Sequence, residues 1–238
     1  MSRFRFYILP RLLLALSVLA LAAGLWVLWL SLGQPMPTAA LACRQAETAR
    51  FLAPSQLLAT GEVHLDEGYT EQDAWAVLRR GEGYALAELE RLAGLLWTVD
   101  WLWSSDPVGS APLFTFATAR STWWDPGEVW RDDYDIGDTD TYVQTVPLAV
   151  CDDPAAVRLE GELLVAGGWE DPQAVYAERA VPIIWSPAEN GVWVGEPVSA
   201  LMPHSPDDPT VLGGSILIWC RAYDAGGNLI ASCDPSAR

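Results

Sequence analysis

A run of twenty-one uncharged residues, Leu12 to Leu32, constrains this chain more than any other feature. The run reads LLLALSVLALAAGLWVLWLSL and contains no proline. A helix of this length rises about 1.5 Å per residue, so it crosses the roughly 30 Å hydrocarbon core of a bilayer. The sequence therefore predicts a transmembrane helix at 12–32, which makes the lipid bilayer the first partner of the chain.

The charges on either side of the apolar run predict its orientation. Arg3, Arg5 and Arg11 precede it, and no acidic residue does. Positive charge is retained on the cytoplasmic side of a membrane. We therefore expect a single-pass cell-membrane protein with a cytoplasmic tip at residues 1–11 and an extracytoplasmic C-terminal domain.

Two alternatives to a retained anchor come from the residues that follow the run. A signal peptide could be cleaved near Ala42, and Ala40-Leu41-Ala42-Cys43 faintly resembles a bacterial lipobox. The apolar run is, however, longer than the roughly 7–15 residues of a signal peptide core. The spacer Gly33-Gln34-Pro35-Met36-Pro37 also separates the possible cleavage site from the run. Both observations favour the retained anchor, and Trp26 and Trp29 lie near its outer end, where amphipathic rings prefer the membrane interface.

The region beyond the membrane is strongly acidic. Of the residues that follow the apolar run, eleven are basic and thirty-one are acidic, which gives this part a formal net charge of −20. Such a domain repels nucleic acid and anionic lipid, so we expect neither as a partner. Hydrophobic residues make up 51% of the chain, which favours a folded domain over a disordered one.

The periodicity of the remaining chain predicts a mainly β fold. Residues 33–54 form a linker and a short stalk helix, which Thr38 can cap and Pro54 ends. Short apolar segments separated by Gly and Pro then predict an antiparallel, β-sandwich-like ectodomain. It could comprise two subdomains, a β meander at 55–141 that carries an acidic, Trp-rich loop, and an Ig-like sandwich at 142–238.

The segment 84–93 is ambiguous because Ala, Leu and Glu, which favour helices, dominate it. Gly81 and Gly83 interrupt any long helix at this point and favour a hairpin. We therefore expect a strand, with a helix as the alternative.

The four cysteines all lie beyond the membrane segment, where disulfides can form. If Gly226-Gly227 is a two-residue hairpin loop, Cys220 and Cys233 face each other directly across two strands. The sequence therefore predicts a Cys220–Cys233 disulfide, with Cys43–Cys151 as a less strongly supported second bond. Four reduced, buried thiols are the alternative.

The stretch 121–141 offers the candidate ligand-binding residues. Calcium is the one cofactor that the aspartates suggest, although the positions flanking Gly137 do not fit an EF-hand loop, and a solvated acidic loop is the simpler interpretation. The candidate calcium ligands are Asp132, Asp133, Asp135, Asp138 and Asp140. Exposed rings beside carboxylates are suited to carbohydrate, whereas buried rings would fill a β core. The candidate rings are Trp123, Trp124 and Trp130.

No motif assigns a catalytic residue. The chain has no nucleophile elbow, no P-loop and no GxGxxG sequence. We therefore expect a binding or interaction module whose partner is a protein or a glycan of the cell envelope. The alternative is an extracytoplasmic, glycosidase-like hydrolase that uses paired carboxylates.

Several segments carry a resemblance. The basic tip and apolar span, followed by FLAPSQLL, AWAVLRRGEGYALAELE and GLLWTVDWLW, resemble uncharacterised membrane-anchored extracytoplasmic proteins of Gram-positive bacteria. The ending RAYDAGGNLI is similar to the last hairpin of bacterial Ig-like surface modules. These resemblances imply a location and a β fold, and they transfer no functional residue.

Overall fold

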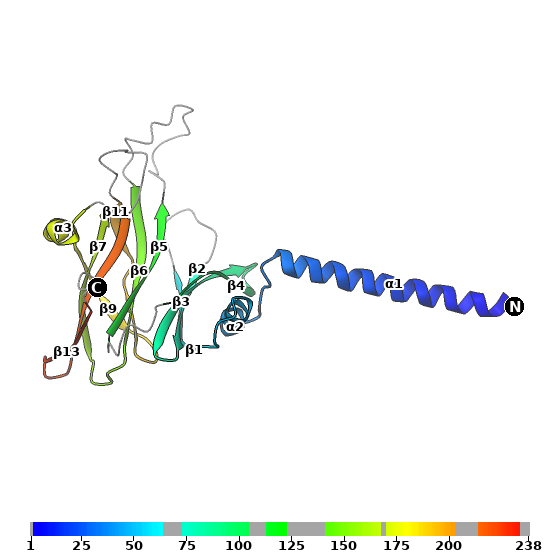
Figure 1. Ribbon diagram of the computed structural model, residues 1–238, viewed down its shortest axis with the longest axis horizontal. Coiled ribbons are helices and arrows are strands. Elements are labelled where there is room, and N and C mark those ends of the chain that lie inside the picture. The colour runs from blue at the N-terminus through cyan, green and yellow to red at the C-terminus, as the bar shows by residue number, and fades with distance from the viewer. Residues whose placement is uncertain are drawn as a thin grey trace, which may run out of the picture.

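The fold is mainly β with an N-terminal apolar helix, as the sequence predicts (Figure 1). A computed structural model describes residues 2–63, 73–104, 113–122, 141–167, 170–202 and 214–233. Strands in these ranges form three antiparallel sheets, which we name sheets A, B and C.

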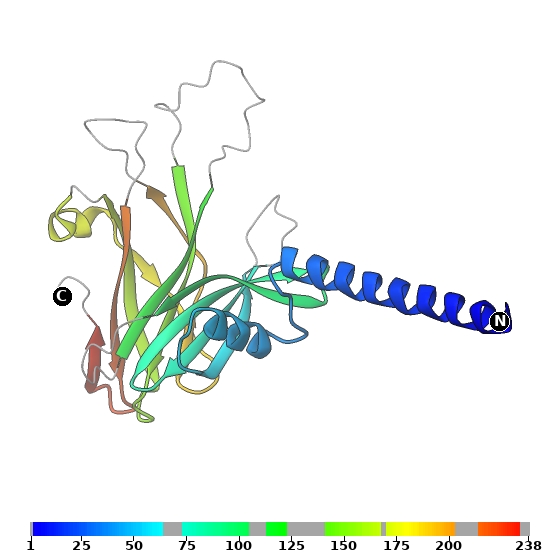
Figure 2. The ribbon, with the colours of Figure 1, turned by 45° about the vertical axis from the view of Figure 1, so that its right-hand side comes forward.

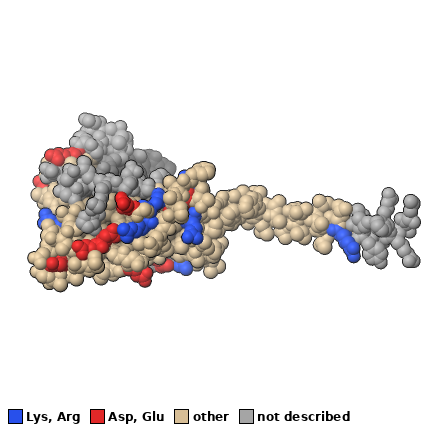
Figure 3. Space-filling view, turned by 60° about the horizontal axis from the view of Figure 1, so that its bottom comes forward, with Lys and Arg blue, Asp and Glu red and all other residues tan. Residues whose placement is uncertain are grey.

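Helix α1, Ser2–Ser31, projects away from the β domain (Figure 1). Its segment Pro10–Ser31 is long and apolar enough to cross a membrane, and none of that segment is buried within the protein. In Figure 3 the helix is uncharged over most of its length, while acidic and basic side chains are interspersed over the β domain. A water-exposed surface of this composition would be unfavourable, so the finding is consistent with a single-pass anchor.

Helix α2, Ala39–Ala49, is the predicted stalk helix. Thr38 caps it as expected, because its hydroxyl oxygen accepts a hydrogen bond from the Leu41 backbone N–H at 3.3 Å. The linker between α1 and α2 is fixed to the β domain by two backbone hydrogen bonds between Met36 and Trp97, of 2.7 and 2.8 Å. The stalk is therefore a packed part of the domain.

Sheet A is an antiparallel meander in chain order. Its strands are β1 Gln56–Val63, β2 Asp73–Arg80, β3 Gly83–Leu92 and β4 Leu96–Ser104. The ambiguous segment is thus a strand, and the pair β2–β3 is the predicted hairpin, closed through Gly81 at a φ of +60°.

Sheet B has the order β11-β6-β10-β9, and β5 also pairs with β6. Its strands are β5 Leu113–Thr122, β6 Thr141–Cys151, β9 Trp185–Pro187, β10 Val192–Gly195 and β11 Val198–Met202. The sequence assigned β5 to the first subdomain, whereas the structure pairs it with β6, in register from Leu113–Cys151 to Thr122–Tyr142. Strand β11 was not predicted from the sequence.

Sheet C has the order β13-β12-β7-β8. Its strands are β7 Arg158–Gly167, β8 Val181–Ile183, β12 Gly214–Tyr223 and β13 Leu229–Cys233. Helix α3, Pro172–Arg179, lies between β7 and β8 in the chain and was not predicted.

The three sheets are stacked, and α2 and α3 lie at the two ends of the stack (Figure 2). Sheet B is the middle layer, so β6 is apolar on both faces. Its Val146, Leu148 and Val150 pack towards sheet A, and Ala149 and Cys151 pack towards sheet C. This two-sided burial explains why the chain reads as an unbroken apolar run from Val146 to Cys151.

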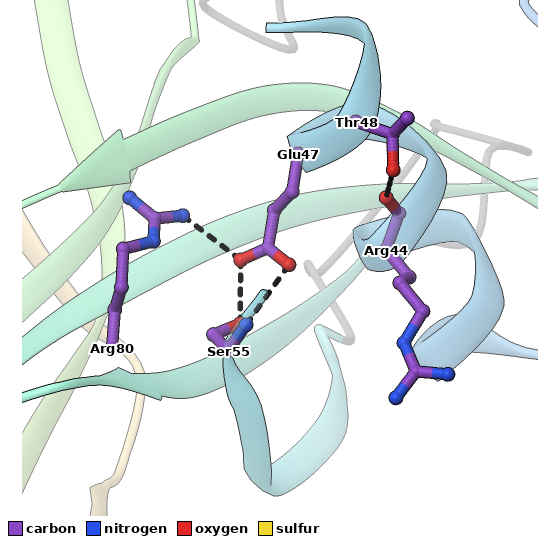
Figure 4. Close-up of polar contacts among 5 residues, drawn as sticks. All are labelled: Arg44, Glu47, Thr48, Ser55 and Arg80. Atoms are coloured by element: carbon purple, nitrogen blue, oxygen red, sulfur yellow. Dashed lines mark hydrogen bonds and ion pairs between the residues drawn. The ribbon is translucent and has the colours of Figure 1, made fainter. Parts of the chain in front are cut away.

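A buried carboxylate joins α2 to the edge of sheet A (Figure 4). Glu47 is 2% exposed and accepts hydrogen bonds from the Ser55 backbone N–H at 3.1 Å and from the Ser55 hydroxyl at 2.5 Å. Its second partner is the guanidinium of Arg80, at 2.9 Å. The negative charge is therefore compensated, as burial of a carboxylate requires.

Candidate functional site

The outward face of sheet C carries a group of ligand-type side chains. On β7, Leu159 and Leu163 point into the core, so Glu160 and Glu162 point outward. The register of β12 against β7 places Arg221 opposite Glu160 and Trp219 opposite Glu162. Two carboxylates, a guanidinium and an indole therefore share one patch of the sheet.

These side chains border a hollow of about 390 Å³, within the usual range of roughly 300–1,000 Å³ for small-ligand sites. We call it the sheet C hollow. Its lining residues are Leu159, Glu160, Gly161, Glu162, Tyr176, Pro182, Ile183, Trp219 and Arg221. Strand β8 covers β7 only from Gly161 to Leu163, so the edge of β7 at Glu160 is left open beside the hollow.

Helix α3 supplies an aromatic wall. The Tyr176 ring meets the Trp219 ring edge to face, with centroids 4.5 Å apart and planes at 67°. The helix is held in place by Glu170, whose carboxylate accepts hydrogen bonds from the Gly167 backbone N–H at 2.7 Å and from Arg179. The hydrogen bond from Arg179 lowers the pKa of Glu170, so the Glu170 carboxylate is charged at neutral pH.

Gly161 lies over a buried hydrogen-bond donor on the core side of β7, the indole of Trp185, which does not line the hollow. A Cβ at this position would lie 2.6 Å from the backbone oxygen of Trp219 and 3.0 Å from Nε1 of Trp185, so only glycine fits. Within the part of the chain that the structure describes, Nε1 of Trp185 is buried and has no hydrogen-bond partner. A buried N–H without an acceptor costs free energy of folding.

The arrangement is suited to a ligand with both apolar faces and hydroxyl groups. Aromatic rings offer flat apolar surface, carboxylates accept hydrogen bonds from hydroxyls, and a guanidinium donates to them. Glu160 is already partnered by Arg158 at 3.1 Å, and its side chain is 53% exposed. Within the described ranges neither Glu162 nor Arg221 takes part in an ion pair, so both can bind a ligand.

The candidate residues of the acidic, Trp-rich loop lie outside the described residues, and their roles stay predictions. They are Trp123, Trp124, Trp130, Asp132, Asp133, Asp135, Asp138 and Asp140. Within the described ranges, no group of three or more His, Cys, Asp or Glu side chains is placed to hold a metal ion.

The structure pairs Cys220 directly with Cys233 across β12 and β13, although the turn differs from the predicted one. The Gly227 N–H binds the Asp224 oxygen, and the Asp224 N–H binds the Asn228 oxygen, which defines a three-residue loop. An irregularity in the pairing between Ala222 and Tyr223 offsets the extra turn residue, so Cys220 again lies opposite Cys233. All four thiols are free in the structure, and the disulfide itself stays a prediction.

Cys43 and Cys151 are buried in two different hydrophobic cores. Cys151 is buried with Cys220 and Cys233 between sheets B and C, whereas Cys43 is buried between α2 and sheet A. Burial raises the pKa of Cys43 to about 12, and it also raises the pKa of Cys151 and of Cys220. These thiols are therefore protonated at neutral pH, which makes them poor nucleophiles.

The sheet C hollow was missed from the sequence, although part of its signal is present. Glu160 and Glu162 alternate with leucine and glycine, and Trp219 alternates with Ile218 and Cys220, as expected of half-buried strands. That alternation identifies which side chains point outward. It cannot show that two strands about sixty residues apart are neighbours.

Comparison of the chain with protein-family models, with curated proteins and with solved structures finds no match. The functional argument therefore depends on the geometry of the hollow and on the membrane-spanning character of α1.

Proposed function

We propose that this protein is a membrane-anchored glycan-binding module of the cell envelope, with α1 in the membrane, the N-terminus in the cytoplasm and the β domain outside. The sheet C hollow is the proposed binding site. The observation that carries the proposal is the Tyr176–Trp219 aromatic wall beside Glu162 and Arg221. The orientation follows from Arg3, Arg5 and Arg11, which precede the apolar run.

The charges of the hollow indicate which sugars it would bind. Glu160 and Glu162 line the hollow with Arg221, and Glu160 is paired with Arg158, so the wall has no excess of positive charge that would select an acidic sugar. The hydroxyl or ammonium groups of neutral and amino-bearing sugars can donate to Glu162. The ligand class is therefore a neutral or amino-bearing oligosaccharide.

A hydrolase acting through Glu160 and Glu162 is the alternative that this pair of carboxylates raises. A general acid is normally held protonated in an apolar setting. The Glu160 side chain is instead 53% exposed, and its carboxylate is already partnered by the Arg158 guanidinium. These contacts support binding over hydrolysis.

The test is a glycan array probed with the full-length protein in detergent micelles. Neutral and amino-bearing oligosaccharides should bind, and acidic ones should not. Replacing Tyr176 with alanine should weaken binding about tenfold, because an aromatic contact contributes on the order of 1 kcal/mol beyond its buried area. Glu162→Gln should weaken it by a similar factor.

Tyr223→Ala is the matched control. Tyr223 lies on β12 two residues from Arg221, is half-buried under the Arg158 guanidinium, and does not line the hollow. Its loss should leave sugar binding within about twofold. Equal losses in Tyr176→Ala and Tyr223→Ala, or an array on which no sugar binds the wild-type protein, would reject the proposed site. Release of reducing sugar that depends on Glu162 would favour the hydrolase.

A further inference from the structure

We propose that a second hollow, between the end of α1, helix α2 and strand β4, binds the phosphate headgroup of one anionic phospholipid. The lipid belongs to the leaflet on the side of the β domain. We call this cavity the juxtamembrane hollow; its volume is about 220 Å³. Its lining residues are Leu30, Gly33, Gln34, Ala42, Gln45, Ala46, Ala49, Arg50, Thr98 and Val99.

The position of Leu30 in the apolar run shows at which level of the bilayer the juxtamembrane hollow would lie. Leu30 lies two residues before the end of the run, or about 3 Å along a helix axis. The neighbouring Trp29 lies in the zone where tryptophan marks the membrane interface, and its Nε1 donates to the Pro35 oxygen at 3.2 Å. The hollow therefore opens at the boundary between hydrocarbon and headgroups, where lipid phosphates lie.

The charge on α2 favours an anion there. Glu47 is the only acidic residue in α2, and it is turned inward to Ser55 and Arg80, away from the exposed Arg44 (Figure 4). Neither Arg44 nor Arg50 takes part in an ion pair within the described ranges. An otherwise acidic domain thus presents unpaired guanidinium groups on the helix beside the membrane anchor.

The shape of the hollow comes from small side chains. Ala42, Ala46 and Ala49 lie on one face of α2, three to four residues apart, and leave space against β4. The Gln45 side chain is hydrogen-bonded to that of Gln34 and so joins α2 to the linker beside the hollow. The space is several times the roughly 30 Å³ of one water molecule, and Arg50 supplies a fork of donors that matches phosphate oxygens.

This inference needs α1 to lie in a bilayer but is independent of glycan binding, because the two hollows share no residue. Failure of the glycan array leaves it unaffected. Failure of lipid binding likewise leaves the sheet C hollow unaffected.

The experiment is native mass spectrometry of the full-length protein released from detergent, with phosphatidylglycerol as the probe. One phosphatidylglycerol should be retained per chain in preference to phosphatidylcholine. Arg50→Gln should weaken retention by about 10- to 100-fold, the equivalent of one charge-assisted hydrogen-bond contact. Ala49→Leu, which fills the hollow without changing its charge, should weaken retention to a similar extent.

Arg44→Gln is the matched control, because Arg44 lies on the same helix but does not line the hollow. It should reduce retention by less than about threefold. Equal losses in Arg44→Gln and Arg50→Gln would show diffuse attraction and overturn the proposal. So would equal retention of phosphatidylcholine, or unchanged binding in Ala49→Leu. Binding of sn-glycerol 3-phosphate as tightly as the lipid would assign the hollow to a free phosphate ester instead.

Discussion

Replacement of Glu47 with alanine should destabilise the β domain by about 3–5 kcal/mol, the range for removing one partner of a buried ion pair. The side chain of Glu47 is 2% exposed, and the side chain of Arg80 is 17% exposed. Both charges are therefore largely removed from water, and within the described residues the Glu47 carboxylate is the one ion-pair partner of the Arg80 guanidinium.

The expected loss of stability follows from the polar groups that Glu47→Ala leaves without a partner. Ser55 loses an acceptor for its N–H and its hydroxyl, and each such bond contributes on the order of 1 kcal/mol. Arg80 keeps a buried charge without compensation, and its Nε already has no partner within the described part of the chain. The second effect should be the larger one, because an unpaired buried charge retains its full desolvation cost.

Thermal and urea unfolding of the full-length protein in detergent measure this effect. For a domain of this size, 1 kcal/mol corresponds to about 2–4 °C in Tm, so Glu47→Ala should lower Tm by roughly 10 °C. Glu160→Ala is the matched control, since Glu160 also pairs with an arginine but both side chains are more than half exposed. It should cost less than about 1 kcal/mol.

A double-mutant cycle tests the reasoning itself. Arg80→Met removes the buried charge, so in its presence Glu47→Ala should cost at least about 2 kcal/mol less than in the wild-type protein. Additive effects of Glu47→Ala and Arg80→Met would refute the interpretation of the cluster as a coupled pair. A cost of Glu47→Ala no greater than that of Glu160→Ala would refute it as well.

Two further predictions concern the thiols. A Cys220–Cys233 disulfide should appear in non-reducing peptide maps and add about 3 kcal/mol, so that dithiothreitol lowers Tm in the wild type but not in Cys220→Ser; a Cys220–Cys151 peptide or free thiols would contradict it. Because the folded state raises the pKa of Cys43 from 9.0 to about 12, its contribution to stability is complete below pH 9 and is lost between pH 9 and 12. The fall in unfolding free energy over that range should therefore be shallower in Cys43→Ala, by up to about 1.4 kcal/mol per pH unit, and equal slopes would exclude this contribution.

Local signals predicted the local structure well. The apolar run, the Thr38 cap and the glycines around β2–β3 each act within a few residues, and each element forms as expected. The pairing of Cys220 with Cys233 was predicted for an incorrect reason. A three-residue turn and a second irregularity at Ala222 offset each other, and sequence periodicity detects neither.

The assignment of β5 to the first subdomain and the omission of the sheet C hollow have a common physical cause. Both depend on which strands become neighbours, and that is decided by burial on both faces of sheet B. The even-numbered side chains of β6 fill one core and its odd-numbered side chains fill another, so β6 needs a layer on each side. Periodicity shows that β6 is buried, but it does not identify the strands that cover it.

The stacking order also separates the two hollows by charge. Helix α2 and its unpaired arginines lie at the anchor end of the stack, while Glu160 and Glu162 lie on sheet C at the opposite end (Figure 1). A domain with a net charge of −20 is repelled by an anionic membrane surface, and this repulsion acts over about 10 Å at 0.1 M salt. Arg44 and Arg50 at the anchor end would weaken this repulsion locally and so favour an orientation with α2 nearest the bilayer. The Met36–Trp97 and Glu47–Arg80 contacts join the linker and α2 rigidly to sheet A, so that orientation would hold the sheet C hollow away from the membrane, where an envelope glycan could reach it.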